Sequence, residues 1–248
     1  MKGTFFNKDI EWNIETTHES WPQGETISGV LKVKNHGKET LKLLESGVAL
    51  SLGEIKKVQS RSDGALKIEQ SQSVGNTDLT PGAVVEVPFS FKIDPNAPVT
   101  DKKQSYYLSF GQNFNESQLQ VKISPKVLYL KVTGLLDTFY RFKLKEFKAA
   151  KKGVEFKFIP PSSREMANIE SLLLTYTMEG NNLTMMFHFQ VKKLDTTSVT
   201  NKLSKETLTI KKELTPKEYS LGPDLIHQDQ ILQCLDSVLS QVKLNNVF

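Results

Sequence analysis

Apolar side chains occupy every second position over much of this chain, and this period of two constrains the fold more than any other feature. It is clearest at residues 84–93, where polar residues or proline separate five apolar ones: Val85, Val87, Phe89, Phe91 and Ile93. Successive side chains of an extended segment point to opposite faces, so the pattern predicts a strand with one face in a core. Pro95 and Pro98 follow and predict an exposed loop over residues 94–104.

The first 124 residues contain six further segments of this kind, and together they predict about seven short strands. These segments are residues 10–14, 27–33, 48–52, 66–68, 106–110 and 119–123. Turn sequences such as Asn35-His36-Gly37 and Pro81-Gly82 separate them. Short strands at this spacing are typical of a β-sandwich, which we predict for residues 1–124.

The second half resumes the alternation after an interruption. Residues 125–139 extend the apolar set with Leu135 and Leu136, which fits a linker or a short helix. Further strands are predicted at residues 140–144, 154–158, 169–178, 183–191 and 208–214, with a hairpin turn at Gly180-Asn181. We therefore predict a second β-sandwich over residues 140–221.

The last segment, residues 222–248, changes to helical spacing. Its apolar residues recur every three or four positions, at Ile231, Leu235, Val238 and Val242. This predicts an amphipathic helix of about five turns. The apolar stripe either packs on the second sandwich or pairs with another chain in a homo-oligomer, and the sequence leaves both open.

The charge balance excludes some classes of function. The chain has 32 basic and 28 acidic residues, a net charge of +4, and its only arginines are Arg61, Arg141 and Arg164. Arginine is the preferred reader of phosphates and guanines, so we expect no nucleic-acid binding. The N-terminal residues do not resemble a signal peptide and no apolar run could span a bilayer, so we expect a cytoplasmic protein.

No pattern in the sequence carries catalytic or metal chemistry. His18, His36, His188 and His227 are scattered, and no two stand at the spacing of metal ligands. Cys234 is the single cysteine, so no intramolecular disulfide can form, and no basic neighbour would activate its thiol. We predict that the protein is not an enzyme and has no catalytic, cofactor-binding or metal-binding residues.

Residues 140–158 mix lysines with phenylalanines and admit two interpretations. One is a basic, aromatic platform for anionic lipid or single-stranded nucleic acid. The other is a hairpin with Phe142, Phe156 and Phe158 inside and its lysines in solvent. The alternation places these rings on the face opposite the lysines and favours the second interpretation. Weak contact with anionic lipid stays an alternative.

Three stretches resemble the arrestin-like superfamily. Two of them are GETISGVLKVKN at residues 24–35 and VVEVPFSFKIDPNAPVT at residues 84–100. They contain a Gly-Glu pair before a strand and a Pro-Phe-x-Phe strand before a proline loop. The third, VEFKFIPPSSREMANIESLLLTY at residues 154–176, is similar to the second half of the bacterial sporulation-control protein M family. The resemblance covers most of the chain, from Lys8 to Leu194.

This resemblance implies an all-β fold of two immunoglobulin-like or arrestin-like β-sandwich domains, with a short linker and the C-terminal helix. It also implies a non-catalytic cytoplasmic adaptor or regulatory scaffold that binds protein partners. Three places would suit a partner: strand edges, the groove between the domains, and the 94–104 loop. The phosphate-sensing switch of visual arrestins needs an arginine in a charged cluster, and none of the three arginines lies in a matching motif.

Two other functions stay open. One is a peripheral membrane-surface or trafficking factor that binds anionic lipid through the lysine-rich hairpin. The other is a carbohydrate-binding or hydrolytic β-sandwich, which would need Trp12 and Trp21 exposed for stacking on sugars. Trp12 alternates with charged neighbours, so we expect it in the core instead.

Overall fold

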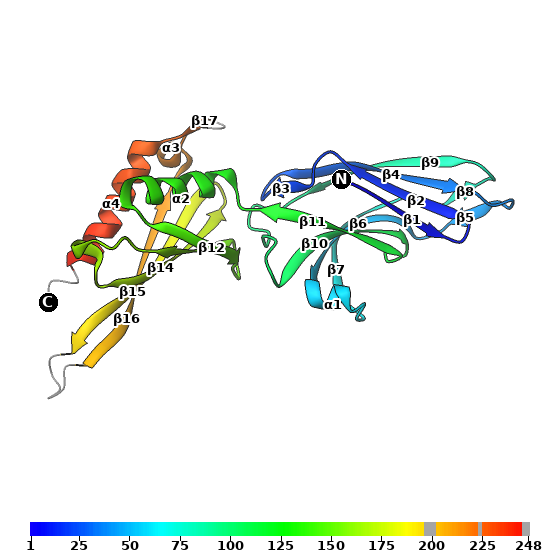
Figure 1. Cartoon of the computed structure of the whole chain (residues 1–248). Helices are drawn as coiled ribbons and strands as arrows, with labels where there is room; N and C mark the ends of the chain where they lie inside the picture. Colours follow the sequence, from blue (N-terminus) through cyan, green and yellow to red (C-terminus); the bar gives the residue numbers. More distant parts are fainter. Residues whose placement is uncertain (196–201, 223–224, 245–248) are drawn as a thin grey trace. The chain divides into compact units, whose positions relative to one another are not determined.

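The computed structural model of the chain describes residues 1–195, 202–222 and 225–244, and Figure 1 shows its elements. The chain divides into two compact units, Met1–Ser124 and Pro125–Phe248. Strands outnumber helices in each unit, which confirms the predicted all-β class.

The first unit is a sandwich of two sheets. One sheet has the order β1-β2-β4-β9, formed by Lys2–Asn7, Ile10–Thr16, Thr26–Asn35 and Val84–Lys92. The other has the order β3-β11-β10-β6-β7, formed by Ser20–Pro22, Ser117–Ser124, Gln104–Gln112, Ser46–Glu54 and Leu66–Ser73. The unit also holds the small pair β5 (Leu41–Leu43) and β8 (Thr77–Leu79), and the short helix α1 (Ile55–Gln59).

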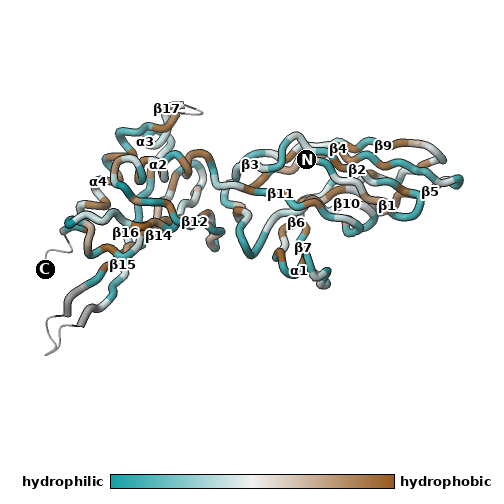
Figure 2. Tube along the Cα trace, in the orientation of Figure 1, coloured by the Kyte–Doolittle hydropathy of each residue, from teal (hydrophilic) through white to brown (hydrophobic). Residues whose placement is uncertain are grey.

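The inward residues of both sheets meet in one core, as the alternation predicted. Apart from Val85, every apolar residue of the predicted 85–93 strand is buried there, with inward residues of β2, β4, β6, β10 and β11. Figure 2 shows hydrophobic and hydrophilic residues alternating along these strands. Trp12 and Trp21 are each 1% exposed, so neither ring is available for stacking on a sugar.

Strand β4 makes room for an aromatic side chain at Gly29. Gly29 lies opposite Phe89 in the β4–β9 ladder. A Cβ atom at Gly29 would come within 2.5 Å of the Phe89 ring and still closer to the carbonyl oxygen of Glu15. The ring of Phe89 therefore occupies the space that a larger residue at position 29 would need.

Pro88 lies in β9, the last strand of its sheet. The N–H of Lys92 in the same strand points away from the sheet and donates to Oε1 of Gln70 at 3.2 Å. Backbone direction alternates along a strand, so the nitrogen of Pro88 also points outward, where no ladder hydrogen bond is lost. A strand accommodates proline at an edge or at a bulge, and Pro88 lies at an edge.

The second unit contains one five-stranded antiparallel sheet, in the order β12-β13-β14-β15-β16. Its strands are Lys143–Ala149, Val154–Ile159, Ile169–Glu179, Asn182–Asp195 and Lys202–Leu214. The predicted turn joins β14 to β15, and Gly180 takes φ 62° at the first central position of this two-residue turn. Glycine is favoured there in a type II′ hairpin.

Helices rather than a second sheet form the other layer of this unit, which differs from the predicted sandwich. Helix α2 (Val127–Tyr140) occupies the segment predicted as a linker or short helix, and Arg141 ends it with φ 63°. Helix α4 (Gln228–Leu244) is the predicted C-terminal helix. Both helices bury an apolar stripe, so the inward face of the sheet is covered without a second sheet. The buried apolar residues of these helices are Tyr129, Val132, Leu135, Leu136, Ile231, Leu235, Val238, Leu239 and Val242.

A tyrosine joins the two helices. The hydroxyl of Tyr140 lies 2.8 Å from Oδ1 of Asp236 and 3.3 Å from the carbonyl oxygen of Leu232, both in α4. Four short elements complete the description: the 3₁₀ turn Arg164–Met166, helix α3 (Pro216–Tyr219), and the paired strands β17 (Ser220–Gly222) and β18 (Leu225–Ile226).

The 94–104 loop is not the exposed segment that its prolines predicted. Ala97 is 3% exposed and Val99 is fully buried. Gln23 donates to the carbonyl oxygen of Ala97, and the N–H of Thr100 donates to the carbonyl oxygen of Ile123 at 2.9 Å. The loop belongs to the packed end of the sandwich because its apolar side chains and backbone groups are satisfied there.

Candidate protein-interaction surface

The described residues contain no group of three or more His, Cys, Asp or Glu that could hold a metal ion. His188 is a half-exposed residue of β15, with its Nδ1 atom 2.9 Å from Oγ1 of Thr209. Arg61, Arg141 and Arg164 are all exposed. No helix in the described ranges is long and apolar enough to cross a membrane.

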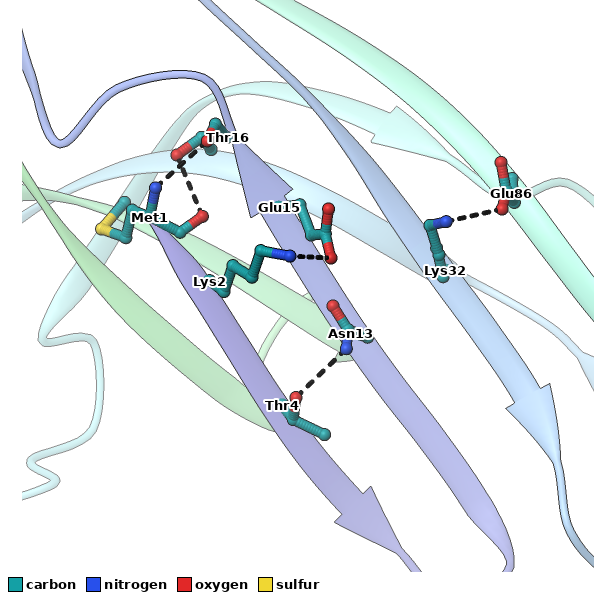
Figure 3. Close-up of polar contacts among 8 residues, drawn as sticks. All are labelled: Met1, Lys2, Thr4, Asn13, Glu15, Thr16, Lys32 and Glu86. Carbon is teal, nitrogen blue, oxygen red and sulfur yellow. Dashed lines mark hydrogen bonds and ion pairs between the residues drawn. The ribbon is translucent and has the colours of Figure 1, made fainter.

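Polar side chains pair across neighbouring strands on the outer face of the β1-β2-β4-β9 sheet, as Figure 3 shows. Lys2 pairs with Glu15 at 2.9 Å and Lys32 pairs with Glu86 at 2.8 Å. The hydrogen bond from Lys2 holds the pKa of the Glu15 carboxyl below its usual value. These pairs are exposed to water and screened by salt, so the face is typical of a solvated surface.

A polar groove of about 830 Å³ lies in the first unit, with Ser109 of β10 and Gln118 of β11 in its lining. Arg61, Asn113 and Phe114 also line the groove. These three residues have φ values of 52°, 51° and 54°, a region that residues other than glycine rarely adopt. The lining presents hydrogen-bonding groups of both charges, so it suits a polar ligand better than an apolar helix.

The lysine-rich hairpin β12–β13 has the predicted phenylalanines inside, but its first strand begins at Lys143 and not at the predicted residue 140, because Tyr140 ends helix α2, and Leu144 is exposed. Its phenylalanine rings at 142, 156 and 158 are fully buried. Lys143 pairs with Asp137 at 2.5 Å and Lys148 with Glu155 at 2.8 Å. Lys145 stands where the β12–β13 register shifts, which marks a bulge. Lysines and a bulge on an edge strand discourage pairing with another strand.

Other sheet edges carry features with the same effect. On β9, Pro88 lacks a donor, and the amide of Gln70 bonds both the N–H and the carbonyl oxygen of Lys92, at 3.2 Å and 2.7 Å. The β6–β7 register shifts between Leu50 and Ser51, so β7 is also irregular. Strand β3 has only three residues. These edges are poor templates for an added strand.

Strand β16 also carries outward lysines, Lys205 and Lys211, but it has no proline, no register shift and no shortening. It is the longest edge strand of the described residues, with 13 residues and neither proline nor glycine. It pairs with β15 without a register shift from Leu183–Leu214 to Asp195–Lys202. A long, regular edge offers a row of backbone donors and acceptors to an extended peptide.

The ladder shows which residues of β16 face outward. The pair Glu179–Asn182 closes a two-residue turn and is therefore hydrogen-bonded. Hydrogen-bonded pairs alternate along each ladder, so the even-numbered residues of β15 bond to β14 and its odd-numbered residues bond to even-numbered residues of β16. The odd-numbered residues of β16 therefore direct their N–H and C=O groups away from β15. The side chains of these residues are exposed too: Lys205, Thr207, Thr209, Lys211 and Glu213.

The charges on this edge are partly balanced within the chain. Lys205 pairs with Glu170 at 2.7 Å, and Lys211 lies 3.9 Å from Glu179 and 4.0 Å from Glu213. Thr207 and Thr209 stand between these two lysines. Their position leaves the middle of the edge without a charge that would repel a partner strand.

The sequence indicated strand edges as docking places but did not identify β16. The alternation over 208–214 predicted a strand, yet nothing in it showed that no further strand follows β16 in the sheet. Residues 202–214 contain no proline and no glycine, and this was the one sequence signal for a long, regular strand. The predicted groove between the two units stays a prediction.

The apolar stripe of the C-terminal helix is buried within the second unit. Ile231, Leu235 and Val238 are 0% exposed and Val242 is 1% exposed. A pairing of this helix with another chain would therefore have to use other residues. Burial raises the pKa of the Cys234 thiol in the same helix, which lowers its reactivity.

No family model and no curated protein matches the chain. Among solved structures, the crystal structure of Spo0M, a sporulation control protein from Bacillus subtilis, matches it with a TM-score of 0.62. The match covers 95% of this chain and 99% of that chain, at 16% sequence identity. The chain therefore shares the fold of Spo0M, and the resemblance that the motifs indicated is confirmed at the level of the fold.

Proposed function

Starting from this shared fold, we propose that the chain is a non-catalytic regulatory protein that binds a partner protein in the cytoplasm. The partner adds an extended segment to the sheet of the second unit, along the open edge of β16. The proposal rests on the contrast between β16, which is long and regular, and the edge strands β7, β9 and β12, which carry a register shift or a proline. Strand addition supplies affinity through backbone hydrogen bonds and specificity through alternate side chains.

Other functions on the same fold have less support. A carbohydrate-binding sandwich needs exposed aromatic rings, and both tryptophans are buried. A hydrolytic site needs converging carboxylates in a cleft, whereas Glu15 and Glu86 in the first unit are paired with lysines on a solvated face. A regulatory protein that works by binding needs only a surface, and Spo0M is itself described as a sporulation control protein.

Proline substitution on the edge tests the proposal. Thr207→Pro removes an N–H that points outward, so it blocks strand addition and leaves the β15–β16 ladder intact, as Pro88 does in β9. The matched control is Ser90→Pro, at an exposed position of β9 that also points outward. A photo-crosslinking residue at position 207 identifies the partner in cells, and the purified partner is then titrated against each variant.

We expect Thr207→Pro to weaken binding at least about tenfold, because one backbone hydrogen bond is lost and the added strand is displaced. Ser90→Pro is expected to bind as the wild type does. Circular dichroism checks that both variants are folded. Wild-type affinity in a folded Thr207→Pro variant would overturn the proposal.

A second candidate function is contact with an anionic membrane through the β12–β13 hairpin. It is favoured by Leu144 and Phe147, which are 40% and 36% exposed beside Lys145 and the lysines at 151 and 152 in the turn. Apolar side chains among lysines are typical of interfacial contact. Co-sedimentation with vesicles rich in phosphatidylserine tests it: Lys145, Lys151 and Lys152 changed together to Gln should abolish sedimentation, and a wild type that stays in the supernatant excludes the function.

A further inference from the structure

Strand β16 is complementary to itself when it is placed antiparallel to a second copy. We propose that the edge of β16 pairs with β16 of a second copy of this chain, about a two-fold axis that passes through Thr209. This inference rests on the proposed function, because it names an occupant of the same edge. The result is one continuous sheet made from the five strands of each copy.

The outward residues set the hydrogen-bonded pairs of this ladder. With the axis at Thr209, that residue lies opposite Thr209 of the second copy, and Thr207 lies opposite Lys211. Lys205 lies opposite Glu213, which places a positive charge beside a negative one twice, once on each side of the axis. Odd-numbered residues bond to odd-numbered residues, as their outward backbone groups require.

The pairs between these positions are complementary on the other face of the sheet. Glu206 lies opposite Lys212 of the second copy, and Leu208 lies opposite Ile210. These are the non-hydrogen-bonded pairs of the ladder, in which side chains approach most closely. Ile210 is 8% exposed within its own unit and Leu208 is partly exposed, so pairing gives Leu208 an apolar neighbour.

Neighbouring registers lack this match. An axis at Leu208 places Lys205 opposite Lys211, and two like charges then meet on each side of the axis. An axis at Ile210 places Lys212 opposite Leu208. Like charges directly opposite one another destabilise a strand pair, so the charge pattern of residues 205–213 selects the register centred on Thr209.

The self-pairing has a functional consequence. A copy bound at β16 occupies the same backbone groups that a partner segment would use, so self-association and partner binding compete. The opposite-charge pairs lie near the surface, so added salt should weaken the dimer. The protein would then exchange between a self-paired form and a form whose edge is open.

A pair of charge reversals tests the register. Lys205→Glu places two acidic residues opposite each other, and Glu213→Lys places two lysines opposite each other, so each variant alone should be monomeric. An equimolar mixture restores both opposite-charge pairs and should form a dimer. Lys122→Glu, on an exposed position of β11, is the control and should associate as the wild type does. Sedimentation velocity at several protein concentrations measures these four samples and the wild type.

A cysteine test reports the axis directly. In a Cys234→Ser background, Thr209→Cys should oxidise to a covalent dimer, because facing residues of a hydrogen-bonded pair lie within disulfide range. Thr207→Cys should not, because its own counterpart lies far along the strand. A wild type that stays monomeric at every concentration, or a mixture of the two charge variants that stays monomeric, overturns the inference.

The two proposals fail in different ways. The self-pairing is overturned if the wild type is monomeric. If the Thr207→Pro variant still binds the partner more weakly than the wild type does, the proposed function stands. Partner binding that is unaffected by Thr207→Pro overturns the proposed function, even where the sedimentation experiment shows a dimer.

Discussion

The rings of Tyr129 and Tyr176 stack with their centroids 5.0 Å apart and their planes 10° from parallel, which fastens helix α2 to the sheet of the second unit. Both side chains are fully buried. The hydroxyl of Tyr176 lies 3.4 Å from Oγ1 of Thr133, whereas the hydroxyl of Tyr129 is buried with no hydrogen-bond partner among the described residues. The hydroxyls of the two stacked tyrosines therefore contribute differently to the stability of the second unit.

Removing these two hydroxyls should change the stability of the protein differently. Tyr176→Phe leaves Thr133 without its partner and should lower the free energy of unfolding by about 1 kcal/mol. Tyr129→Phe removes a buried polar atom that has no partner, so it should be neutral or slightly stabilising. Urea denaturation followed by circular dichroism measures both. Equal losses of stability in the two variants would contradict the assignment.

Alkaline pH should destabilise the fold through its tyrosines. Burial raises the pKa of all six: Tyr106, Tyr107, Tyr129, Tyr140, Tyr176 and Tyr219. The unfolded chain ionises its phenols near pH 10 while the folded chain keeps them neutral, so their contribution is present below about pH 10 and is lost as the pH rises further. Tyrosinate absorbance should therefore appear together with unfolding. Ionisation at pH 10 in a chain that keeps its native circular dichroism would refute this expectation.

Two glycine substitutions should change stability in opposite directions. Gly29→Ala forces a methyl group against the Phe89 ring and the Glu15 carbonyl, and should cost about 1–3 kcal/mol. Gly134→Ala, in helix α2 with open space around it, should stabilise by about 0.5–1 kcal/mol because alanine is the better helix former. Thermal denaturation of both variants measures the two changes in stability. A Gly29→Ala variant as stable as the wild type would mean that Phe89 does not fill this space.

The C-terminal helix should be essential for the stability of the second unit. Leu235→Ala leaves a cavity at a fully buried position and should cost about 2–5 kcal/mol. Gln233→Ala, two residues earlier on the exposed side of the helix, is the control and should change little. Equal stability of the two variants in urea denaturation would show that the stripe is not packed in solution.

Much of the fold could be predicted because strand formation with one buried face is a local property. The alternation over Val85–Ile93 identified β9 and its inward side. The strand Lys2–Asn7, with a glycine and an asparagine in its inward series, was missed because its apolar signal is short. The covering of the second sheet by α2 and α4 was also missed. Whether a sheet face meets a sheet or a helix depends on chain segments far apart in sequence.

The sequence by itself determined which residues of each strand point into a core, because side-chain direction alternates with every residue whatever lies nearby. It also contained the charge order of residues 205–213 that makes β16 complementary to itself. Only the tertiary structure decided that β16 is the last strand of its sheet, since an edge is defined by the absence of a neighbouring strand. The same charges in a central strand would face β15 and its opposite neighbour, and no second chain could reach them.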